Sequence, residues 1–441
     1  MDKTPIHDAP PQPRSVEETG LALTFLADLA LKTIYLRGSL LGHEIADVVK
    51  LPFATVVDEV LDYLRRERLA EVKGATSVGK SAYRYTLLQK GHTRARELFK
   101  RSQYVGPAPV TLEAYTEMVK AQSLAGLTIA DDALRRALAQ LVLSDALVNQ
   151  IGPAINSGKA VFLFGNTGNG KTTIAEAIGI ALPGAMWIPY AIGVDEQIIR
   201  VFDARHHCTV VEKNEPEARS GALRYLPSTR EHFDQRWVFC RRPLIVAGGE
   251  LTLKNLNLIY DPVMKIYEAP YQMKANGGVF LLDDLGRQRI QPHTLLNRWI
   301  VPLEKRVDYL TLAAGQKIDV PFDARIIFAT NLQPKDLVDE AFLRRIRYKI
   351  YVPDPTWDEF REIFKREAAE RNIPYLEEGL QYLVAEYYTK PRRQPRGVHP
   401  RDLLDGLVHL ARFRGSAPKM TKEMLDLACL PYFLKQPEGE A

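Results

Sequence analysis

The residues with the clearest chemistry lie in one stretch, Gly-Asn-Thr-Gly-Asn-Gly-Lys-Thr-Thr, which runs from Gly165 to Thr173. It fits the phosphate-loop pattern G-x-x-x-x-G-K-[ST]. Glycines let the backbone bend so that several N–H groups converge on a polyphosphate. Lys171 adds a full positive charge, and the Thr172 hydroxyl is a suitable magnesium ligand. The stretch therefore predicts a nucleotide phosphate site.

All nine residues of this stretch are predicted to contact the nucleotide: Gly165, Asn166, Thr167, Gly168, Asn169, Gly170, Lys171, Thr172 and Thr173. The loop must be held by the elements on either side of it. Val161–Phe164 is apolar and predicts a short buried strand, and a helix is expected to begin at Lys171. The positive N-terminal end of that helix stabilises an anion at the same point.

A nucleotide triphosphatase also needs an acidic group for magnesium and a group that activates water. Val279–Leu282 predicts an apolar strand that ends in Asp283 and Asp284. Ligands bind at the carboxyl ends of strands in parallel sheets. We expect Asp283 to hold magnesium, directly or through water, and Asp284 to orient and polarise the attacking water.

Two further groups follow along the chain. The predicted strand Arg325–Thr330 ends in Asn331, whose amide is expected to reach the attacking water or the terminal phosphate. Arg344 and Arg345 stand near the end of a predicted helix. They fit a solvated helix face, or an arginine pair that stabilises the transition-state charge in a neighbouring subunit.

In this order, the motifs resemble those of the AAA+ ATPase superfamily over about residues 120–415. The resemblance implies Walker A over Gly165–Thr172, Walker B over Phe280–Asp284 and sensor 1 at Asn331. It also implies ATP and Mg²⁺ as cofactors, and a P-loop α/β core whose parallel sheet lies between helices. A C-terminal helical lid completes the implied architecture.

The resemblance assigns the remaining catalytic positions to arginines. It implies an arginine finger at Arg345 or at the adjacent Arg344. The sensor 2 arginine, at the head of a lid helix, best matches Arg401, with Arg396 as the second choice. A finger acts only on a neighbouring subunit, so the resemblance implies a homo-oligomer, expected to be a hexameric ring.

The region from Leu282 to Asn331 looks most like MoxR-type and related hairpin-bearing AAA+ proteins. The whole chain is also similar to bacterial proteins described as predicted ATPases with chaperone activity associated with pilus assembly. One departure concerns Asp284, because the family usually has glutamate there. The missing methylene withdraws the carboxylate by about 1.5 Å, so we expect slow ATP turnover.

The N-terminal part predicts a different kind of unit. Residues 1–15 are rich in proline and charge and are expected to be disordered. Residues 16–105 contain predicted helices and two predicted strands around Gly74–Lys80, a pattern that resembles a winged helix-turn-helix domain. The helix that would enter the major groove begins at Pro52, and its exposed positions offer acids where a DNA reader needs Arg, Asn or Gln. Protein docking is therefore favoured over DNA binding.

The rest of the chain divides by composition. Residues 106–355 form the predicted α/β ATPase core, and within it the polar, arginine-rich stretch 206–243 is interpreted as an insertion. Residues 356–435 form the predicted helical lid. The net charge of +5 is too small to indicate nucleic acid by itself. There is no secretory signal pattern and no apolar run long enough for membrane insertion, so a cytoplasmic location is expected.

Three functions fit these observations. The leading hypothesis is an AAA+ ATPase that hydrolyses ATP between subunits and remodels a protein client, not identified by the sequence, that the N-terminal domain recruits. The second is an ATP-dependent regulator that binds DNA through the winged-helix domain. The third is a switch that binds ATP and hardly hydrolyses it, motivated by Asp284.

Overall fold

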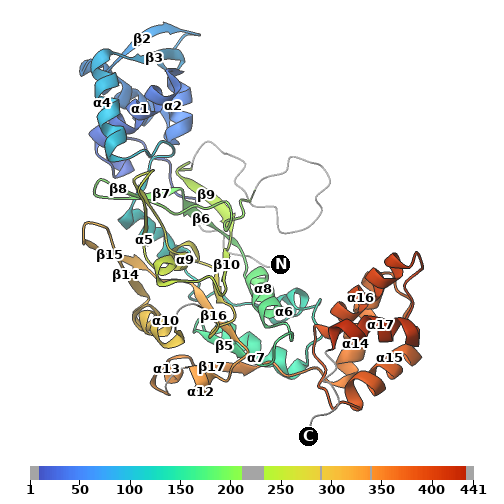
Figure 1. Cartoon of the computed structure of the whole chain (residues 1–441). Coiled ribbons are helices and arrows are strands. Elements are labelled where there is room, and N and C mark those ends of the chain that lie inside the picture. Colours follow the sequence, from blue (N-terminus) through green and yellow to red (C-terminus); the bar gives the residue numbers. More distant parts are fainter. Residues whose placement is uncertain (1–8, 211–232, 289–290, 338–339, 434–441) are drawn as a thin grey trace.

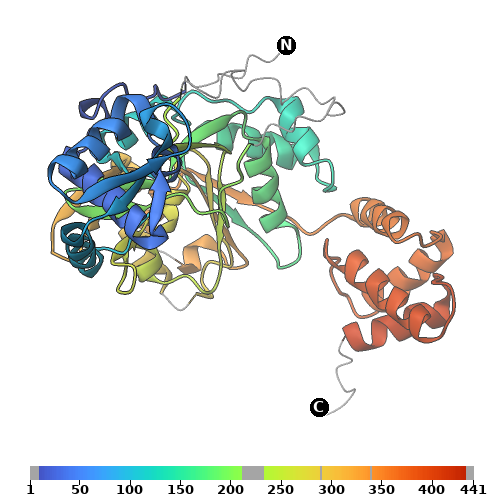
Figure 2. The same ribbon diagram turned by 90° about the horizontal axis from the view of Figure 1, so that it is seen from above.

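The computed structural model describes residues 9–210, 233–288, 291–337 and 340–433. Along the chain, Figure 1 shows an N-terminal unit, an α/β body and a C-terminal helical unit. Figure 2, seen from above, shows the C-terminal unit standing to one side of the body. None of the described helices is long and apolar enough to cross a membrane.

The body is built on a five-stranded sheet in which every pair of neighbours is parallel. In spatial order its strands are β10 (Leu244–Ala247), β13 (Val279–Leu282), β16 (Arg325–Thr330), β5 (Val161–Phe164) and β17 (Tyr348–Tyr351). All residues of β13 and β16 are buried, as expected for strands covered on both faces. The predicted parallel sheet is confirmed.

Side chains of β5 alternate between two hydrophobic cores, one on each face of the sheet. Val161 and Leu163 pack with α6, α7 and α8. Phe162 faces the other core, where its ring lies 5.5 Å from that of Phe328 and where Trp299 is also buried. The helices around the sheet are α6 (Asp131–Ala137), α7 (Asp145–Asn156), α8 (Lys171–Ala181), α10 (Pro292–Arg298), α11 (Ile300–Lys305), α12 (Pro334–Leu337) and α13 (Glu340–Arg345).

A second five-stranded sheet of order β11–β12–β8–β7–β4, a two-stranded sheet and a hairpin extend the body. An apolar strand at residues 185–189 pairs antiparallel with a strand at residues 237–241, outside the central sheet. These additional elements are β4 (Val110–Thr111), α5 (Leu112–Ala121), β6 (Ala185–Pro189), β7 (Ala191–Val194), β8 (Gln197–Arg200), β9 (Trp237–Arg241), β11 (Ile259–Asp261), β12 (Ile266–Glu268), α9 (Tyr271–Lys274), β14 (Val307–Thr311) and β15 (Lys317–Pro321). Strands β14 and β15 form the hairpin, which lies in sequence between β13 and β16.

The stretch 206–243, interpreted as an insertion, contains a strand and a buried arginine near its C-terminal end. Residues 211–232 lie outside the described part of the chain, but β9 is paired with β6. Arg236 is only 4% exposed, pairs with Asp234 at 2.8 Å and donates hydrogen bonds to the carbonyls of Thr19 and Pro109. The buried Arg236 guanidinium therefore connects the body to the N-terminal unit by hydrogen bonds.

The N-terminal unit packs four helices against a three-stranded antiparallel sheet of order β1–β3–β2. Its elements are α1 (Leu23–Arg37), β1 (Ser39–Leu41), α2 (Gly42–Val49), α3 (Asp58–Arg66), β2 (Ala70–Ala75), β3 (Tyr83–Leu87) and α4 (Gln89–Arg101). The expectation of disorder over residues 1–15 is wrong for residues 9–15, and residues 1–8 lie outside the described part. Pro11 pairs with Phe233, and Pro10 accepts a hydrogen bond from Asp234.

The C-terminal unit is entirely helical and has its own hydrophobic core. Its helices are α14 (Trp357–Glu370), α15 (Glu377–Val384), α16 (His399–Phe413) and α17 (Lys422–Tyr432). Thr356 caps α14, because its hydroxyl accepts the Glu359 N–H while the Glu359 carboxylate accepts the Thr356 N–H. A short segment after β17 connects this unit to the sheet.

Candidate nucleotide site

The phosphate loop connects β5 to α8 in a conformation that requires glycine. Gly170 has a φ of 79°, in the left-handed region that glycine adopts at little cost. A Cβ on Gly165 would lie 2.3 Å from the carbonyl oxygen of Val352, so no larger residue fits there. Among the described residues, the backbone N–H groups of Gly168, Asn169 and Gly170 donate no hydrogen bond. Together with the N-terminus of α8, they suit an anion.

Lys171 is only 8% exposed and is held within the loop. Its ammonium donates to the carbonyls of Gly165 and Asn166 at 3.0 and 2.9 Å. Burial lowers the pKa of Lys171, and the charges of Asp283 and Asp284 oppose that shift. Those carbonyls are uncharged, so the lysine's positive charge remains available to a phosphate.

Thr172 and Asp283 meet directly, although they are far apart in the sequence. The Thr172 hydroxyl donates to Oδ2 of Asp283 at 2.7 Å. The other carboxylate oxygen, Oδ1, accepts the Asp284 N–H at 2.9 Å. The side chain of Gln288 holds this turn in place. Its Nε2 donates to the Asp283 carbonyl, and its Oε1 accepts the Gly286 N–H. The hydroxyl and the carboxylate are oxygen donors of the type that Mg²⁺ prefers, so these two residues fit the ion.

Asp284 lies next to this pair and is exposed. Its φ of 50° is in the left-handed region, which aspartate tolerates better than most residues. The charge of its carboxylate acts on Lys171. An exposed carboxylate beside the lysine is placed where a water could be polarised.

Asn331 follows β16, the strand between β5 and β13. Its Oδ1 atom is buried and has no hydrogen-bond partner in the described part of the chain. The backbone beside it is fixed, because the Thr330 hydroxyl donates to Leu285 O at 2.6 Å and accepts the Leu332 N–H. A buried acceptor without a donor is costly, so Asn331 is suited to receive a hydrogen bond from a bound water.

Four predicted site residues therefore lie at one edge of the sheet. β13, β16 and β5 are adjacent and parallel, and their carboxyl ends carry Asp283, Asn331 and the phosphate loop with Lys171 and Thr172. This placement follows from the strand order alone, since the three loops leave the sheet at the same edge.

The predicted finger residues lie elsewhere on the body. Arg344 and Arg345 end α13, and both are exposed. Nε of Arg345 contacts the Glu304 carboxylate of α11 at 2.6 Å. An exposed position at a helix end is compatible with presentation to another subunit, and the ion pair fixes the orientation of the side chain.

The two sensor 2 candidates differ in their surroundings. Arg401 lies on α16, its side chain is 57% exposed, and Nε pairs with the adjacent Asp402. Arg396 precedes α16 and donates to the Asp354 carboxylate at 3.0 Å. Its charge also acts on the pKa of Lys171. In this structure Arg396 is brought to the phosphate loop, and Arg401 faces solvent.

Sequence reasoning missed Asp354, which follows β17. Its carboxylate accepts hydrogen bonds from the side-chain amides of Asn166, at 2.9 Å, and Asn169, at 2.7 Å, in addition to Arg396. Burial alone would raise the pKa of Asp354, but these three donors hold it below its ordinary value. One ionised carboxylate thus joins the phosphate loop to the segment that leads into α16.

The same segment covers the phosphate loop. The Gly397 N–H donates to Oδ1 of Asn169 at 3.2 Å. A Cβ on Gly168 would lie 2.5 Å from a methyl carbon of Val398, so the two chains are in close contact. Entry of a nucleotide and movement of this segment are therefore linked by packing.

The His206–Cys208 region is a second stretch to consider for a metal. Among the described residues, no group of three or more His, Cys, Asp or Glu side chains is arranged to hold an ion. His207 is buried and its Nε2 contacts the Lys274 carbonyl at 2.9 Å. Its Nδ1 accepts the Asp203 N–H, so both ring nitrogens are used in packing.

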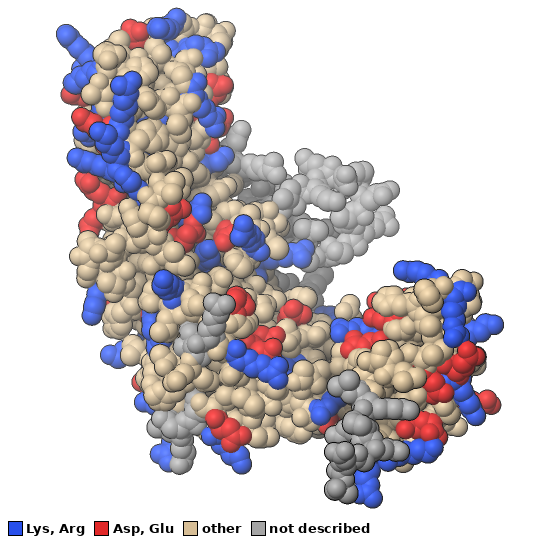
Figure 3. Space-filling view, in the orientation of Figure 1, with Lys and Arg blue, Asp and Glu red and all other residues tan. Residues whose placement is uncertain are grey.

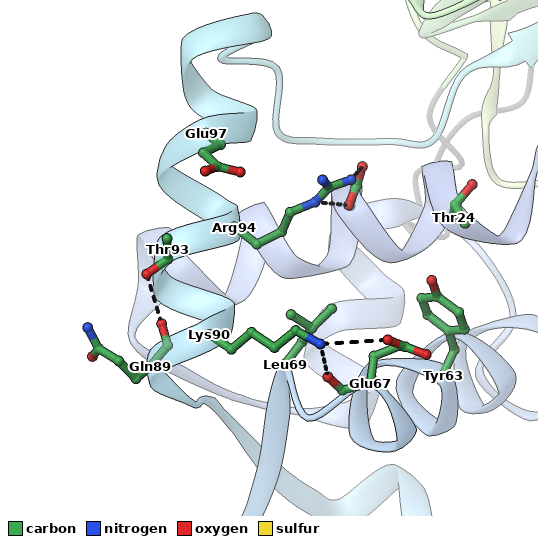
Figure 4. A pocket seen from close by; sticks show the side chains of 10 residues that line it. Thr24, Tyr63, Glu67, Leu69, Gln89, Lys90, Thr93, Arg94 and Glu97 are labelled. Atoms are coloured by element: carbon green, nitrogen blue, oxygen red, sulfur yellow. Dashed lines mark hydrogen bonds and ion pairs between the residues drawn. The ribbon is translucent and has the colours of Figure 1, made fainter.

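Several charged side chains of the N-terminal unit form ion pairs with one another. Lys80, near the tip between β2 and β3, pairs with Asp58 at 2.9 Å and with Asp62 at 3.0 Å, both on α3. A cavity of about 620 Å³ lies beside α4 (Figure 4), and its ion pairs join Arg94 to Asp28 and Lys90 to Glu67. Lys80, Lys90 and Arg94 are therefore each paired with a carboxylate.

The parallel sheet and the helices around it give the body an α/β architecture. A family model described as a domain of unknown function (DUF8689) matches residues 356–430, the C-terminal helical unit. Among curated proteins, no sequence matches the chain.

Three of the similar solved structures illustrate how distant the likeness is. NtrX from Brucella abortus in complex with ADP is 16% identical, with a TM-score of 0.40, over 70% of this chain and 59% of NtrX. The same protein with ATP is 13% identical, with a TM-score of 0.38, over 83% and 63%. A P216G mutant of RuvB from Thermotoga maritima is 11% identical, with a TM-score of 0.35, over 68% and 70%. The chain thus spans less than two thirds of the length of NtrX.

Proposed function

We propose that this protein is an AAA+ ATPase that binds ATP with Mg²⁺ and hydrolyses it at subunit interfaces to remodel a partner protein. The observation that carries the proposal is the 2.7 Å contact between the Thr172 hydroxyl and the Asp283 carboxylate. It unites the phosphate loop and the acidic strand end, the two parts that nucleotide hydrolysis requires.

Binding would use the loop as a cradle. The N–H groups of Gly168–Gly170 and the N-terminus of α8 would hold the phosphate oxygens, and Lys171 would leave its two carbonyl partners for the outer phosphates. Thr172 and Asp283 would hold Mg²⁺, which when bound neutralises charge on the phosphate groups. Asn331 would accept a hydrogen bond from the attacking water, as its orphaned Oδ1 indicates.

Hydrolysis needs a group that withdraws a proton from that water. Asp284 is exposed, lies close to Lys171 and is the nearest candidate for this task. It is one methylene shorter than glutamate, so turnover would be slow. The arginine finger would be Arg345, with Arg344 beside it, which implies a ring in which each subunit completes its neighbour's site.

Motion would come from the helical lid. Arg396 and Gly397 contact Asp354 and Asn169, so occupancy of the loop would be transmitted to α16. The β14–β15 hairpin between β13 and β16 supports membership of the hairpin-bearing AAA+ proteins of the MoxR type. Lid movement against the body would act on a client held by the N-terminal unit.

The N-terminal unit has the element order of a winged helix, and its charges favour a protein client. Asp58 and Asp62 occupy the helix that would enter a DNA groove, and they bind the wing residue Lys80. DNA binding remains the second candidate because of α4. Figure 3 shows Lys and Arg gathered on the side of this unit that carries α4. The exposed cations of α4 are Lys90, Arg94, Arg96, Lys100 and Arg101.

The test is ATP binding with and without the phosphate-loop lysine. Titration with ATP and Mg²⁺ should give saturable binding to the wild type and to Lys159→Ala, an exposed lysine at the other end of β5. Lys171→Ala should weaken binding by about a hundredfold or more. Equal affinities of Lys171→Ala and the wild type would contradict the proposal. Stimulation of ATP hydrolysis by duplex DNA, lost at high salt, would favour the second candidate.

A further inference from the structure

A second cavity lies at the opposite edge of the central sheet from the phosphate loop. Its volume is about 580 Å³, within the range of small-molecule sites. Gly158, which precedes β5, and Arg325, the first residue of β16, line it. The phosphate loop follows the other end of β5, so the two sites are separated by the length of a strand.

Several segments of the body form the walls of the cavity. α5 lies beside β15 of the hairpin, and both contribute lining residues (Figure 1). The turn between α11 and β14 supplies Lys305 and Arg306, and the turn after α7 supplies Asn156. Hydroxyls of Thr116 and Ser123 add neutral polar groups. The cavity thus combines apolar walls with a few polar groups, as ligand sites commonly do.

Positive charge dominates the lining. Four cations line the cavity, and only two carboxylates do; these six residues are Lys120, Lys305, Arg306, Arg325, Asp319 and Asp323. Arg325 is 3% exposed, and its Nε atom has no hydrogen-bond partner in the described part of the chain. Its other nitrogens donate to backbone carbonyls, including that of Leu127 at 3.0 Å. A buried guanidinium with an unused donor is energetically costly.

Arg306 brings a second guanidinium to the same place. It has a φ of 58°, and its side chain donates to the carbonyls of Gly158 and Ala324. Burial lowers the pKa of Arg325, and the Arg306 charge lowers it further, while Asp323 opposes the shift. Asp323 is itself occupied, since its carboxylate accepts the Leu124 N–H at 2.8 Å. Carbonyls accept hydrogen bonds from both guanidinium groups, but a carbonyl carries no full charge to balance them.

We propose that this cavity binds a small molecule that carries a phosphoryl or carboxylate group. The oxyanion would share the charges of Arg306 and Arg325, because planar guanidinium groups match the oxygens of such anions. Lys120 and Lys305, both exposed at the rim, would attract it. The site is separate from the phosphate loop, which follows the other end of β5.

The experiment is calorimetric titration with inorganic phosphate and, separately, with citrate, at constant ionic strength. The protein carries Lys171→Ala throughout, so that the phosphate loop does not contribute. We expect one of the two probes to bind saturably. In that background, Arg306→Gln should weaken binding by about tenfold or more, and Lys254→Ala, an exposed lysine away from the cavity, should leave it unchanged.

A second variant guards against misfolding of Arg306→Gln. Lys120 and Lys305 are exposed, so the double change Lys120→Ala and Lys305→Ala should leave the fold intact and weaken the same probe. Phosphate binding alone would identify a phosphoryl ligand, and citrate binding alone a carboxylate. The proposal is overturned if neither probe binds, or if the double variant and Arg306→Gln bind as tightly as the background protein.

Discussion

Nη1 of Arg396 lies 3.0 Å from Oδ1 of Asp354, and the same oxygen accepts a hydrogen bond from Asn169 at 2.7 Å. Arg396 leads into the C-terminal helices, Asp354 follows β17, and Asn169 belongs to the phosphate loop. Three parts of the chain that are distant in sequence thus share one carboxylate. Whatever moves one of them changes the hydrogen bonding of the other two.

Removal of the Asp354 carboxylate should weaken nucleotide binding. In Asp354→Ala, the amides of Asn166 and Asn169 lose their common acceptor and the loop loses its fixed shape. We expect the Kd for ATP to rise about tenfold, or about 1.4 kcal/mol. The measurement is titration with ATP and Mg²⁺, and Asp358→Ala, an exposed carboxylate on α14, is the control. An unchanged Kd would show that the cluster does not support the loop.

Asp284→Asn should separate binding from hydrolysis. The amide cannot withdraw a proton from water, so steady-state ATP turnover should fall by about a hundredfold. Affinity for ATP should stay within about twofold of wild type, because Lys171, Thr172 and Asp283 are the residues proposed to hold the phosphates and Mg²⁺. Equal turnover in the two proteins would remove Asp284 from the mechanism.

Arg345→Ala should abolish turnover and leave ATP binding intact, because its guanidinium is proposed to serve a neighbouring subunit. Loss of an arginine finger costs about a thousandfold or more in rate. Glu304→Gln, which removes the partner of Arg345 at 2.6 Å but keeps the arginine, is the matched control. Mixing Arg345→Ala with Lys171→Ala subunits should restore part of the activity. No restoration would contradict shared sites.

Acid should destabilise the body through His207. Burial, the largest cause, and the Lys274 charge together hold the pKa of His207 at about 4, against about 6.5 when unfolded. The folded-state pKa is depressed, so the contribution is complete above pH 6.5 and is lost as the pH falls toward 4. The loss amounts to about 3 kcal/mol.

Unfolding by urea at several pH values measures this effect. The slope of unfolding free energy against pH between 6.5 and 4 should be smaller in His207→Asn than in the wild type, whatever the absolute stability of the variant. An identical slope would mean that His207 titrates normally in the folded protein.

The phosphate loop and most strands of the central sheet were readable from local pattern alone. Apolar runs such as Val279–Leu282 predict buried strands because both faces are covered by helices. β17 has no such run, because its residues Tyr348–Tyr351 alternate between partly exposed and buried positions at the edge of the sheet. The apolar residues Ala185–Pro189 are typical of a strand, but their pattern does not reveal that the partner strand is β9.

Some residues of the candidate site can likewise be predicted from local sequence motifs, and others cannot. Thr172 and Asp283 were assigned from motifs, and their contact depends on the order of strands that the motifs imply. Arg396 and Arg401 are five positions apart, and which of them reaches the loop depends on the path of the chain into α16. Asp354 carries no motif, because its function comes only from what folding places around it.

The cavity at Arg325 has a mechanical implication. β16 begins at Arg325 and ends one residue before Asn331, so this strand, about 20 Å long, runs from one binding region to the other. Hydrogen bonds to β5 and β13 on both sides make it stiff. A displacement of Arg325 by a ligand would therefore be transmitted along β16 to Asn331, the amide proposed to meet the attacking water.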